Sequence, residues 1–138
     1  MSEALRVERL DHVTVNVTDV DRAKGFYAGV LGLAEVPRPA SFTFPGAWYA
    51  LGPGPVLLHL VRQVEADPPA SRHFAVWTAD VHAAGRVLEL AGYAVRWDRT
   101  KIPGIDRFFT NDPDGNLIEI QGKEIGEGDQ GKQGTSGD

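Results

Sequence analysis

Hydrophobic residues along the chain follow a strand-like pattern and then a helix-like pattern, and this order occurs twice. Strict alternation of hydrophobic and polar residues, which is typical of a half-buried strand, surrounds residues 12–17 and 73–77. Each of these segments is followed by hydrophobic residues at helical spacing. The helical positions are Val20, Ala23, Phe26, Tyr27, Val30 and Leu31 in the first stretch, and Val81, Ala84, Val87, Leu88 and Ala91 in the second. The chain therefore begins the same pattern, strand then helix, twice.

Three short strand-like runs follow each predicted helix, separated by turn residues. Glycine and proline mark the turns, as in Pro45-Gly46 and Pro103-Gly104. The pattern predicts strands over residues 34–38, 47–51 and 56–61 in the first half, and over residues 93–97, 106–110 and 116–121 in the second. The predicted fold class is α+β, with two βαβββ modules over about residues 7–64 and 70–122.

The two halves also share the residues expected to begin and end their helices. An aspartate, Asp19 or Asp80, lies seven residues after His12 or His73 and is suited to cap the helix that follows. Gly32 and Gly92 stand where each helix should end. We therefore expect one domain over residues 1–125, followed by a polar, glycine-rich tail over residues 126–138 that we predict to be disordered.

Composition narrows the function. The chain has 138 residues, 42% of them hydrophobic, a net charge of −5 and no cysteine. A mildly acidic chain without a Lys/Arg cluster is a poor candidate for binding nucleic acid or membranes, and no hydrophobic run could span a bilayer. The N-terminus has no signal-peptide pattern, so a cytoplasmic location is the default expectation. Any bound metal must be held by His, Asp or Glu.

Four ionisable residues occupy equivalent positions in the two halves. His12 and His73 open the modules, while His59 and Glu119 lie in the last strands, 47 and 46 residues further on. Because side chains alternate across a strand, all four should face away from the helix. A single strand histidine is more often structural, but three of four histidines fall on these positions. We therefore predict a divalent metal site, of zinc, nickel, cobalt, manganese or iron, made by these four residues. The fourth histidine, His82, is expected to be solvated.

These residues carry a family resemblance. The segment from Leu10 to Val13, with Asp19 and the run from Phe26 to Leu33, resembles the first module of the vicinal oxygen chelate superfamily, also called the glyoxalase/bleomycin-resistance/dioxygenase superfamily. The segment 111–120 resembles its last hairpin, and segments around residues 38–48 and 59–61 resemble a glyoxalase-like subgroup. The resemblance implies a cup-shaped incomplete barrel, the glyoxalase-like fold, around a metal that binds two adjacent substrate oxygens.

The resemblance also implies candidate reactions. His12, His59, His73 and Glu119 match the four ligand positions of lactoylglutathione lyases, except that His59 stands where such lyases often have a second glutamate. The favoured expectation is a metal-dependent lyase or isomerase, in which the metal polarises a carbonyl and Glu119 is the catalytic base. The alternatives are an extradiol-type dioxygenase, a fosfomycin-type thiol transferase and a non-catalytic, bleomycin-type binding protein.

Substrate contacts are a further expectation. Trp48 and Phe44 are candidates to line the cup, and Arg107 and Lys101 are candidates to hold an anionic group of a small-molecule substrate. In this family the open sheet face is usually covered by homodimerisation. The metal site could lie within one chain or be shared across such a dimer, and the sequence is compatible with both.

Overall fold

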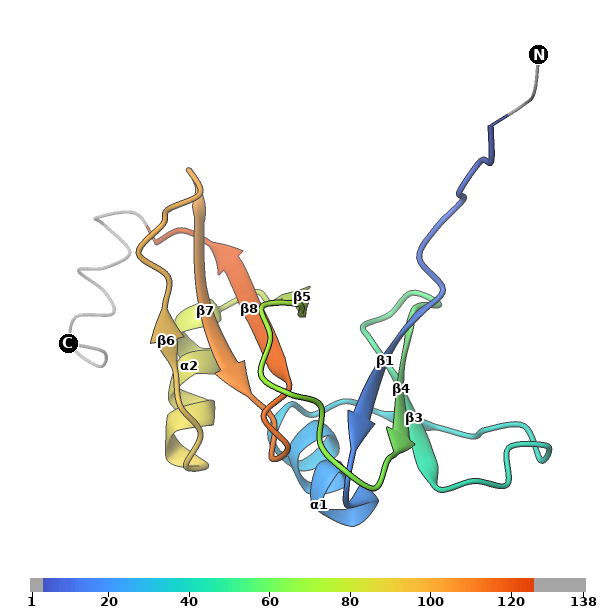
Figure 1. Cartoon of the computed structure of the whole chain (residues 1–138). Helices are drawn as coiled ribbons and strands as arrows, with labels where there is room; N and C mark the ends of the chain where they lie inside the picture. The colour runs from blue at the N-terminus through green and yellow to red at the C-terminus, as the bar shows by residue number, and fades with distance from the viewer. Residues whose placement is uncertain (1–3, 126–138) are drawn as a thin grey trace. The chain divides into compact units, whose positions relative to one another are not determined.

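The chain divides into two compact units, Met1–Ala66 and Asp67–Asp138. The computed structural model describes residues 4–125 of them, so the predicted tail over residues 126–138 lies outside the described residues. Each unit contains one helical segment and one sheet of four strands. Figure 1 shows both units, with most of their helices and strands labelled.

The N-terminal unit follows the predicted order of elements. It contains β1 (His12–Val17), α1 (Val20–Lys24), η1 (Gly25–Val30), β2 (Glu35–Val36), β3 (Gly46–Ala50) and β4 (Leu57–Arg62). The strands lie in the order β1-β4-β3-β2, with β1 parallel to β4 and the other neighbours antiparallel. The first and last strands of the module are therefore direct neighbours.

The C-terminal unit repeats this topology. It contains β5 (Phe74–Trp77), α2 (Val81–Leu90), β6 (Arg96–Trp97), β7 (Ile105–Asn111) and β8 (Leu117–Lys123). The strand order is β5-β8-β7-β6, and β5 is parallel to β8. Both sheets are open at their edges. The prediction of an α+β fold with two βαβββ modules is confirmed, although β2 and β6 are shorter than predicted.

Each sheet buries the face that its helix covers. In the N-terminal unit Val15, Val17, Leu58 and Leu60 are buried, together with Phe26 and Tyr27 of the helical segment. In the C-terminal unit Phe108, Ile118 and Ile120 are buried with Val81 and Leu88 of α2, which lies against β7 and β8 in Figure 1. Burial of each such side chain contributes about 1.5–3 kcal/mol. The alternation predicted for the strands is therefore correct, and it leaves the other sheet face for polar side chains.

The ends of the helices follow the local chemistry of the sequence. The carboxylates of Asp19 and Asp80 accept hydrogen bonds from the backbone amides of Arg22 and Ala83, at 3.1 and 3.0 Å. Gly32 has a φ of 72° and Gly92 a φ of 90°, the left-handed conformation that ends a helix. Both caps were predicted. Among residues 4–125 no helix has the length and apolar character needed to cross a bilayer.

The first helix differs from the predicted regular helix. It is α-helical only over Val20–Lys24 and continues as a π-helix over Gly25–Val30, where the Leu31 amide donates to the Phe26 carbonyl at 2.9 Å. Gly25 and Gly29 have low α-helix propensity. Phe26 and Tyr27, which both belong to the predicted helical pattern, are fully buried in this π-helical segment.

Close packing of the second helix onto its sheet yields a stability prediction. A methyl group at Gly122 of β8 would lie 2.7 Å from the Thr78 carbonyl oxygen and 3.1 Å from Val81 Cβ. Gly122→Ala should therefore lower the free energy of unfolding by about 1–3 kcal/mol, measured by chemical denaturation. The control is Gly25→Ala, at a helical φ of −58° with open space around the added methyl. This control should raise stability by about 0.5–1 kcal/mol. Equal effects of the two substitutions would contradict the packing argument.

Candidate metal centre

The N-terminal unit brings His12 and His59 together. In the parallel β1–β4 pairing, Thr14 is the register partner of His59, so His12 and His59 share a sheet face two residues apart in register. Their rings stack with centroids 4.0 Å apart and planes 14° apart. The predicted orientation of both histidines, away from the helix, follows from this register. The pair lies within one unit and belongs to the first and last strands of that module.

A neighbouring carboxylate orients His12. His12 Nδ1 lies 2.8 Å from Asp11 Oδ2, and the hydrogen bond from His12 lowers the pKa of Asp11. A carboxylate only accepts, so Nδ1 carries the hydrogen and Nε2 is the ring atom with a free lone pair. Carboxylate–histidine pairs of this kind are a common outer support of metal ligands. Sequence reasoning missed Asp11, although its position directly before His12 was the available signal.

His59 has a buried nitrogen with no partner. No donor or acceptor among residues 4–125 makes a hydrogen bond to Nε2 of this ring. Burial lowers the pKa of His59, and the nearby His12 lowers it further. Loss of the proton leaves a neutral imidazole, which is the form that binds metals. Buried polar atoms are usually satisfied, so an orphaned nitrogen requires an explanation such as an ion.

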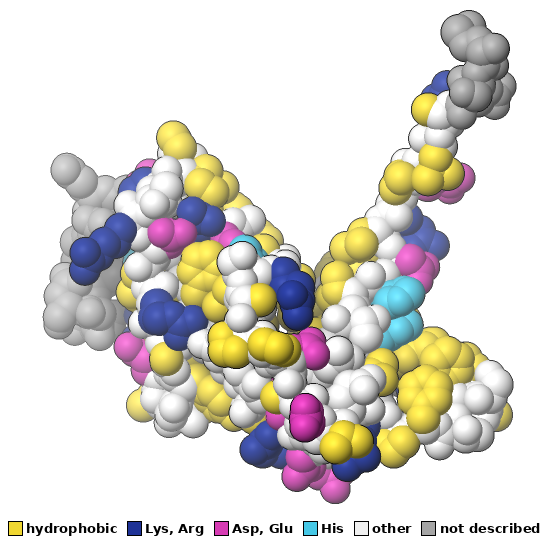
Figure 2. Space-filling view, viewed as in Figure 1, with side chains coloured by type: hydrophobic (Ala, Val, Ile, Leu, Met, Phe, Trp, Pro, Cys, Tyr) yellow, Lys and Arg dark blue, Asp and Glu magenta, His cyan; other side chains and the backbone are white. Residues whose placement is uncertain are grey.

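An aromatic cluster continues from the histidine pair. Trp48, the register partner of His59, stacks on it with centroids 4.0 Å apart and planes 1° apart. Phe42 contacts Trp48 edge-on at 5.0 Å and Phe44 at 5.3 Å, and Phe44 is 44% exposed. Arg38 donates a hydrogen bond to the Phe44 carbonyl at 2.8 Å. Figure 2 shows cyan histidine side chains beside a group of yellow hydrophobic side chains on this unit.

The C-terminal unit brings His73 and Glu119 together. His73 directly precedes β5, and its Nε2 lies 2.9 Å from Glu119 Oε1. His73 Nδ1 lies 2.8 Å from the Ser71 carbonyl oxygen, which can only accept, so Nδ1 carries a hydrogen. In the neutral imidazole, Nε2 is then an acceptor that faces a second acceptor. Such a contact requires a proton or a cation between the two atoms. Glu119 is only 5% exposed, which strengthens this requirement.

Arg107 holds the other oxygen of the same carboxylate. Its Nη1 lies 3.2 Å from Glu119 Oε2, while its Nη2 lies 2.6 Å from Asp98 Oδ2 and donates to the Thr100 carbonyl at 3.1 Å. The Arg107 side chain is 17% exposed. Both groups at the end of the guanidinium are thus engaged within the unit. Sequence reasoning identified Arg107 as a contact for an anionic substrate but not as a partner of Glu119.

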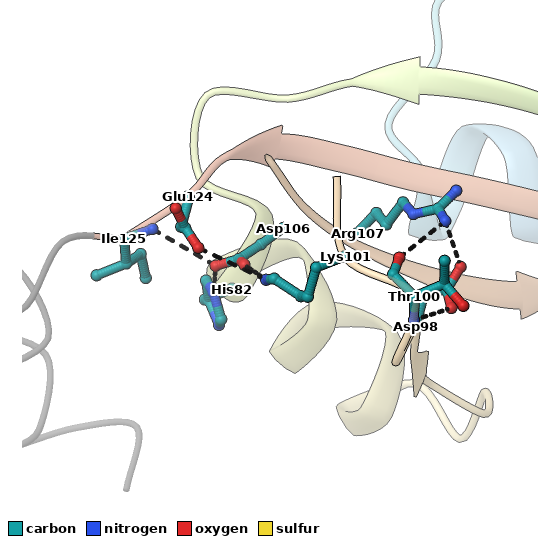
Figure 3. A network of polar contacts seen from close by, with 8 residues as sticks. All are labelled: His82, Asp98, Thr100, Lys101, Asp106, Arg107, Glu124 and Ile125. Carbon is teal, nitrogen blue, oxygen red and sulfur yellow. Dashed lines mark hydrogen bonds and ion pairs between the residues drawn. The ribbon is translucent and has the colours of Figure 1, made fainter. Parts of the chain in front are cut away.

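Lys101 belongs to a second network, centred on Asp106, the residue that precedes Arg107 in β7. Its ammonium pairs with Asp106 and lies 3.8 Å from Glu124 (Figure 3). Asp106 also accepts a hydrogen bond at 2.8 Å from His82, whose ring stacks on Trp97 with centroids 4.6 Å apart. The expectation that His82 is solvated is therefore wrong. A helical pattern places this residue at the second position of α2 but does not show which strand residue lies opposite.

The sequence of the chain is similar to those of known proteins. A sequence model of the Glyoxalase/Bleomycin resistance protein/Dioxygenase superfamily matches residues 9–120. The protein "Glyoxylase I 4" of Arabidopsis thaliana is 32% identical over 126 residues, which are 84% of this chain and 71% of that protein. This chain belongs to that superfamily.

Two solved structures of superfamily type share its fold. A glyoxalase family protein from Bacillus anthracis has a TM-score of 0.79 and 25% identity, over 88% of this chain and 100% of that one. A mutant of the fosfomycin resistance protein FosX from Listeria monocytogenes has a TM-score of 0.73 and 15% identity, over 87% and 95% of the two chains. That structure contains Mn(II) and dihydroxypropylphosphonic acid. At this identity the second comparison supports the fold alone. The superfamily resemblance found in the sequence is thus confirmed.

The residues of this superfamily member suit a divalent ion. Each unit supplies one pair of potential ligands, and among residues 4–125 no three His, Asp or Glu side chains are grouped closely enough to hold an ion together. Three imidazoles with available or unpartnered nitrogens and one buried carboxylate are the donor types preferred by zinc, nickel, cobalt, iron and manganese.

The Lys101 network yields a pH prediction. Burial alone would raise the pKa of Asp106, but hydrogen bonds from His82 and Lys101 outweigh it and lower the pKa below the usual value. The stabilising contribution of the ionised group is therefore present above the unfolded-state pKa of about 3.9 and is lost as the pH falls through the folded-state value. Asp106→Asn should lower the free energy of unfolding by about 1–3 kcal/mol at pH 7.

The pH dependence separates this effect from a general loss of packing. In chemical denaturation the difference between wild type and Asp106→Asn should shrink as the pH falls from about 4 through the lowered folded-state pKa of Asp106, below which both side chains are neutral. Glu35→Gln is the control, because Glu35 forms an exposed pair with Lys24 at 3.3 Å, and such pairs contribute only about 0–1 kcal/mol. A difference for Asp106→Asn that is independent of pH would contradict the assignment.

Proposed function

We propose that the chain is a metal-dependent lyase or isomerase that acts on a small molecule with two adjacent oxygen atoms. In this proposal His12, His59, His73 and Glu119 hold one divalent ion. The observation that carries the proposal is the 2.9 Å contact between His73 Nε2 and the buried Glu119 Oε1, two atoms that both accept unless a proton or cation lies between them.

The surroundings of the histidines support the same function. Asp11 and the Ser71 carbonyl each take the Nδ1 hydrogen of a histidine, so Nε2 is the ligand atom of His12 and His73. His59 has a lowered pKa and an unpartnered Nε2. The Mn(II) in the FosX structure is further support that this fold hosts a divalent ion. The two pairs would meet either within one chain or across a homodimer.

In this proposal the ligand residues and their neighbours have different roles in the reaction. A divalent ion held by these residues would supply Lewis-acid polarisation of a substrate oxygen. Glu119 is the one carboxylate of the four, and it would take up the proton from substrate carbon at an oxygen that leaves its present partner. Its burial excludes water from that oxygen. Phe44 and Trp48 would offer an aromatic surface to the apolar part of the substrate, next to the His12–His59 pair.

Lys101 and Arg107, the two predicted anion contacts, are paired with carboxylates of the chain itself. Lys101 is paired with Asp106 and Glu124, and Arg107 with Glu119 and Asp98. Any anion contact by either side chain would require it to leave these partners. We therefore favour a substrate recognised through its metal-binding oxygens and its apolar part rather than through a charged tail.

Metal content tests the proposal directly. The purified protein should retain a divalent metal in stoichiometric amount, measured by elemental analysis. His12→Ala, His59→Ala, His73→Ala and Glu119→Gln should each lose most of it, because each removes one of four ligands. His82→Gln is the matched control and should retain it, since His82 pairs with Asp106 instead.

The metal that is found and the reaction that it supports distinguish the alternatives. Metal-loaded protein is tested with thiohemiacetals, catechols and fosfomycin. Deuterium uptake from solvent at the substrate carbon by the metal-loaded wild type is the expected result. Oxygen consumption with a catechol and bound iron would indicate a dioxygenase instead. Wild type without stoichiometric metal would contradict the proposal and indicate a binding protein.

Tryptophan fluorescence gives an independent test of the His59 ligand. The Trp48 ring lies 4.0 Å from the His59 ring, so paramagnetic Co(II) bound there should quench its emission. In a Trp77→Phe background, which removes the third tryptophan, titration with Co(II) should quench the parent and Trp97→Phe but leave Trp48→Phe nearly unaffected. Trp97 is the control because it stacks on His82, outside the proposed ligands. Equal quenching of both variants would argue against His59 as a ligand.

A further inference from the structure

Arg107 makes shorter contacts with Asp98 and Thr100 than with Glu119. Its Nη2 is used twice, by Asp98 Oδ2 at 2.6 Å and by the Thr100 carbonyl at 3.1 Å, as Figure 3 shows. Its Nη1 reaches Glu119 Oε2 at the longer distance of 3.2 Å. The segment around residues 98–100 therefore fixes the guanidinium, and the guanidinium in turn fixes one oxygen of the carboxylate.

The strand register explains why the Arg107 side chain can reach the Glu119 carboxylate. Phe109 of β7 is the register partner of Glu119, and Arg107 lies two residues before it, so both project from the same sheet face. The guanidinium carbon also lies 5.9 Å from the centre of the Phe109 ring. Sheet, ring and anchor thus hold the Arg107 side chain in one position beside Oε2.

The two oxygens of Glu119 therefore have different surroundings. Oε1 faces His73 Nε2 at 2.9 Å, and Oε2 faces Arg107. A carboxylate oxygen that already accepts from a fixed cation is less available to a metal than the other oxygen. A permanent positive charge at this distance also opposes a second cation, unless a nearby negative charge compensates for it. Asp98 is placed to do so.

We infer that Arg107 is a positioning residue that restricts Glu119 to binding metal through Oε1 alone, and that Asp98 offsets the charge of Arg107 so that the metal is retained. This inference rests on the proposed function, because it concerns a ligand of the proposed ion. It assigns opposite effects to the two members of one ion pair. A purely structural ion pair would instead make both substitutions harmful in the same direction.

The test is a Co(II) titration of the full-length protein, followed by its visible absorption. Asp98→Asn should weaken Co(II) binding roughly 10–100-fold, the usual range for an outer support of a ligand. Arg107→Gln should strengthen Co(II) binding and lower the intensity of the visible bands, since Glu119 becomes free to use both oxygens and raise the coordination number. Arg107→Lys keeps the charge and should restore the wild-type dependence on Asp98.

The double variant gives the sharpest outcome. If Asp98 acts through Arg107, then Asp98→Asn should have no further effect on Co(II) affinity in the Arg107→Gln background. Arg99→Gln is the matched control, because it removes one positive charge from an exposed residue next to Asp98 and should leave affinity and spectrum unchanged.

Failure of this inference differs from failure of the proposed function. A wild-type protein that binds no Co(II) contradicts both. Stoichiometric binding by wild type, with equal losses in Asp98→Asn and Arg107→Gln or with an unchanged spectrum, overturns only the positioning role. If Arg107→Gln does not fold, as judged by circular dichroism, Arg107→Lys with and without Asp98→Asn decides the question.

Discussion

Parallel pairing between the first and last strand of each module is the constraint on which the candidate site depends. Residues 46 or 47 positions apart in sequence become neighbours because β1 runs beside β4 and β5 beside β8. In one unit this pairing stacks His12 on His59, and in the other it sets His73 against Glu119. A hairpin between consecutive strands could not bring these residues together, since the helix and two further strands lie between them in the chain.

The electrostatics of the two pairs follow from what lies just outside them. Asp11 and the Ser71 carbonyl fix which nitrogen of His12 and His73 carries the hydrogen. Burial lowers the pKa of His59, and Arg107 contacts one oxygen of Glu119. These supports are short-range contacts within each unit. They leave unshared electron pairs on the ring nitrogens and on one carboxylate oxygen, which is the condition for binding a cation.

Much of the fold could be predicted because its causes are local. Alternation assigned the faces of the strands, the aspartate caps fixed the helix starts, and the two glycines with positive φ fixed their ends. The π-helical turn could not be predicted, because Phe26 and Tyr27 fit regular helical spacing equally well and only their packing in the folded unit distinguishes the two. The partners of His82, Lys101 and Arg107 were missed for the same reason. A one-dimensional pattern gives the face of a side chain but not the charge that lies opposite on another strand.

The aromatic segment near Phe44 is attached differently from the histidines. It lies in the connection between β2 and β3, tied by the Arg38 hydrogen bond and by contact with Trp48, and it takes no part in the β1–β4 ladder. Gly46, at the end of this connection, approaches the Leu60 backbone so closely that a methyl group would lie 2.3 Å from the carbonyl oxygen. The end of the connection at Gly46 is thus constrained to glycine, whereas the residues at its tip are under no such packing constraint. Residues at that tip could be exchanged without rebuilding the strands that carry the imidazoles.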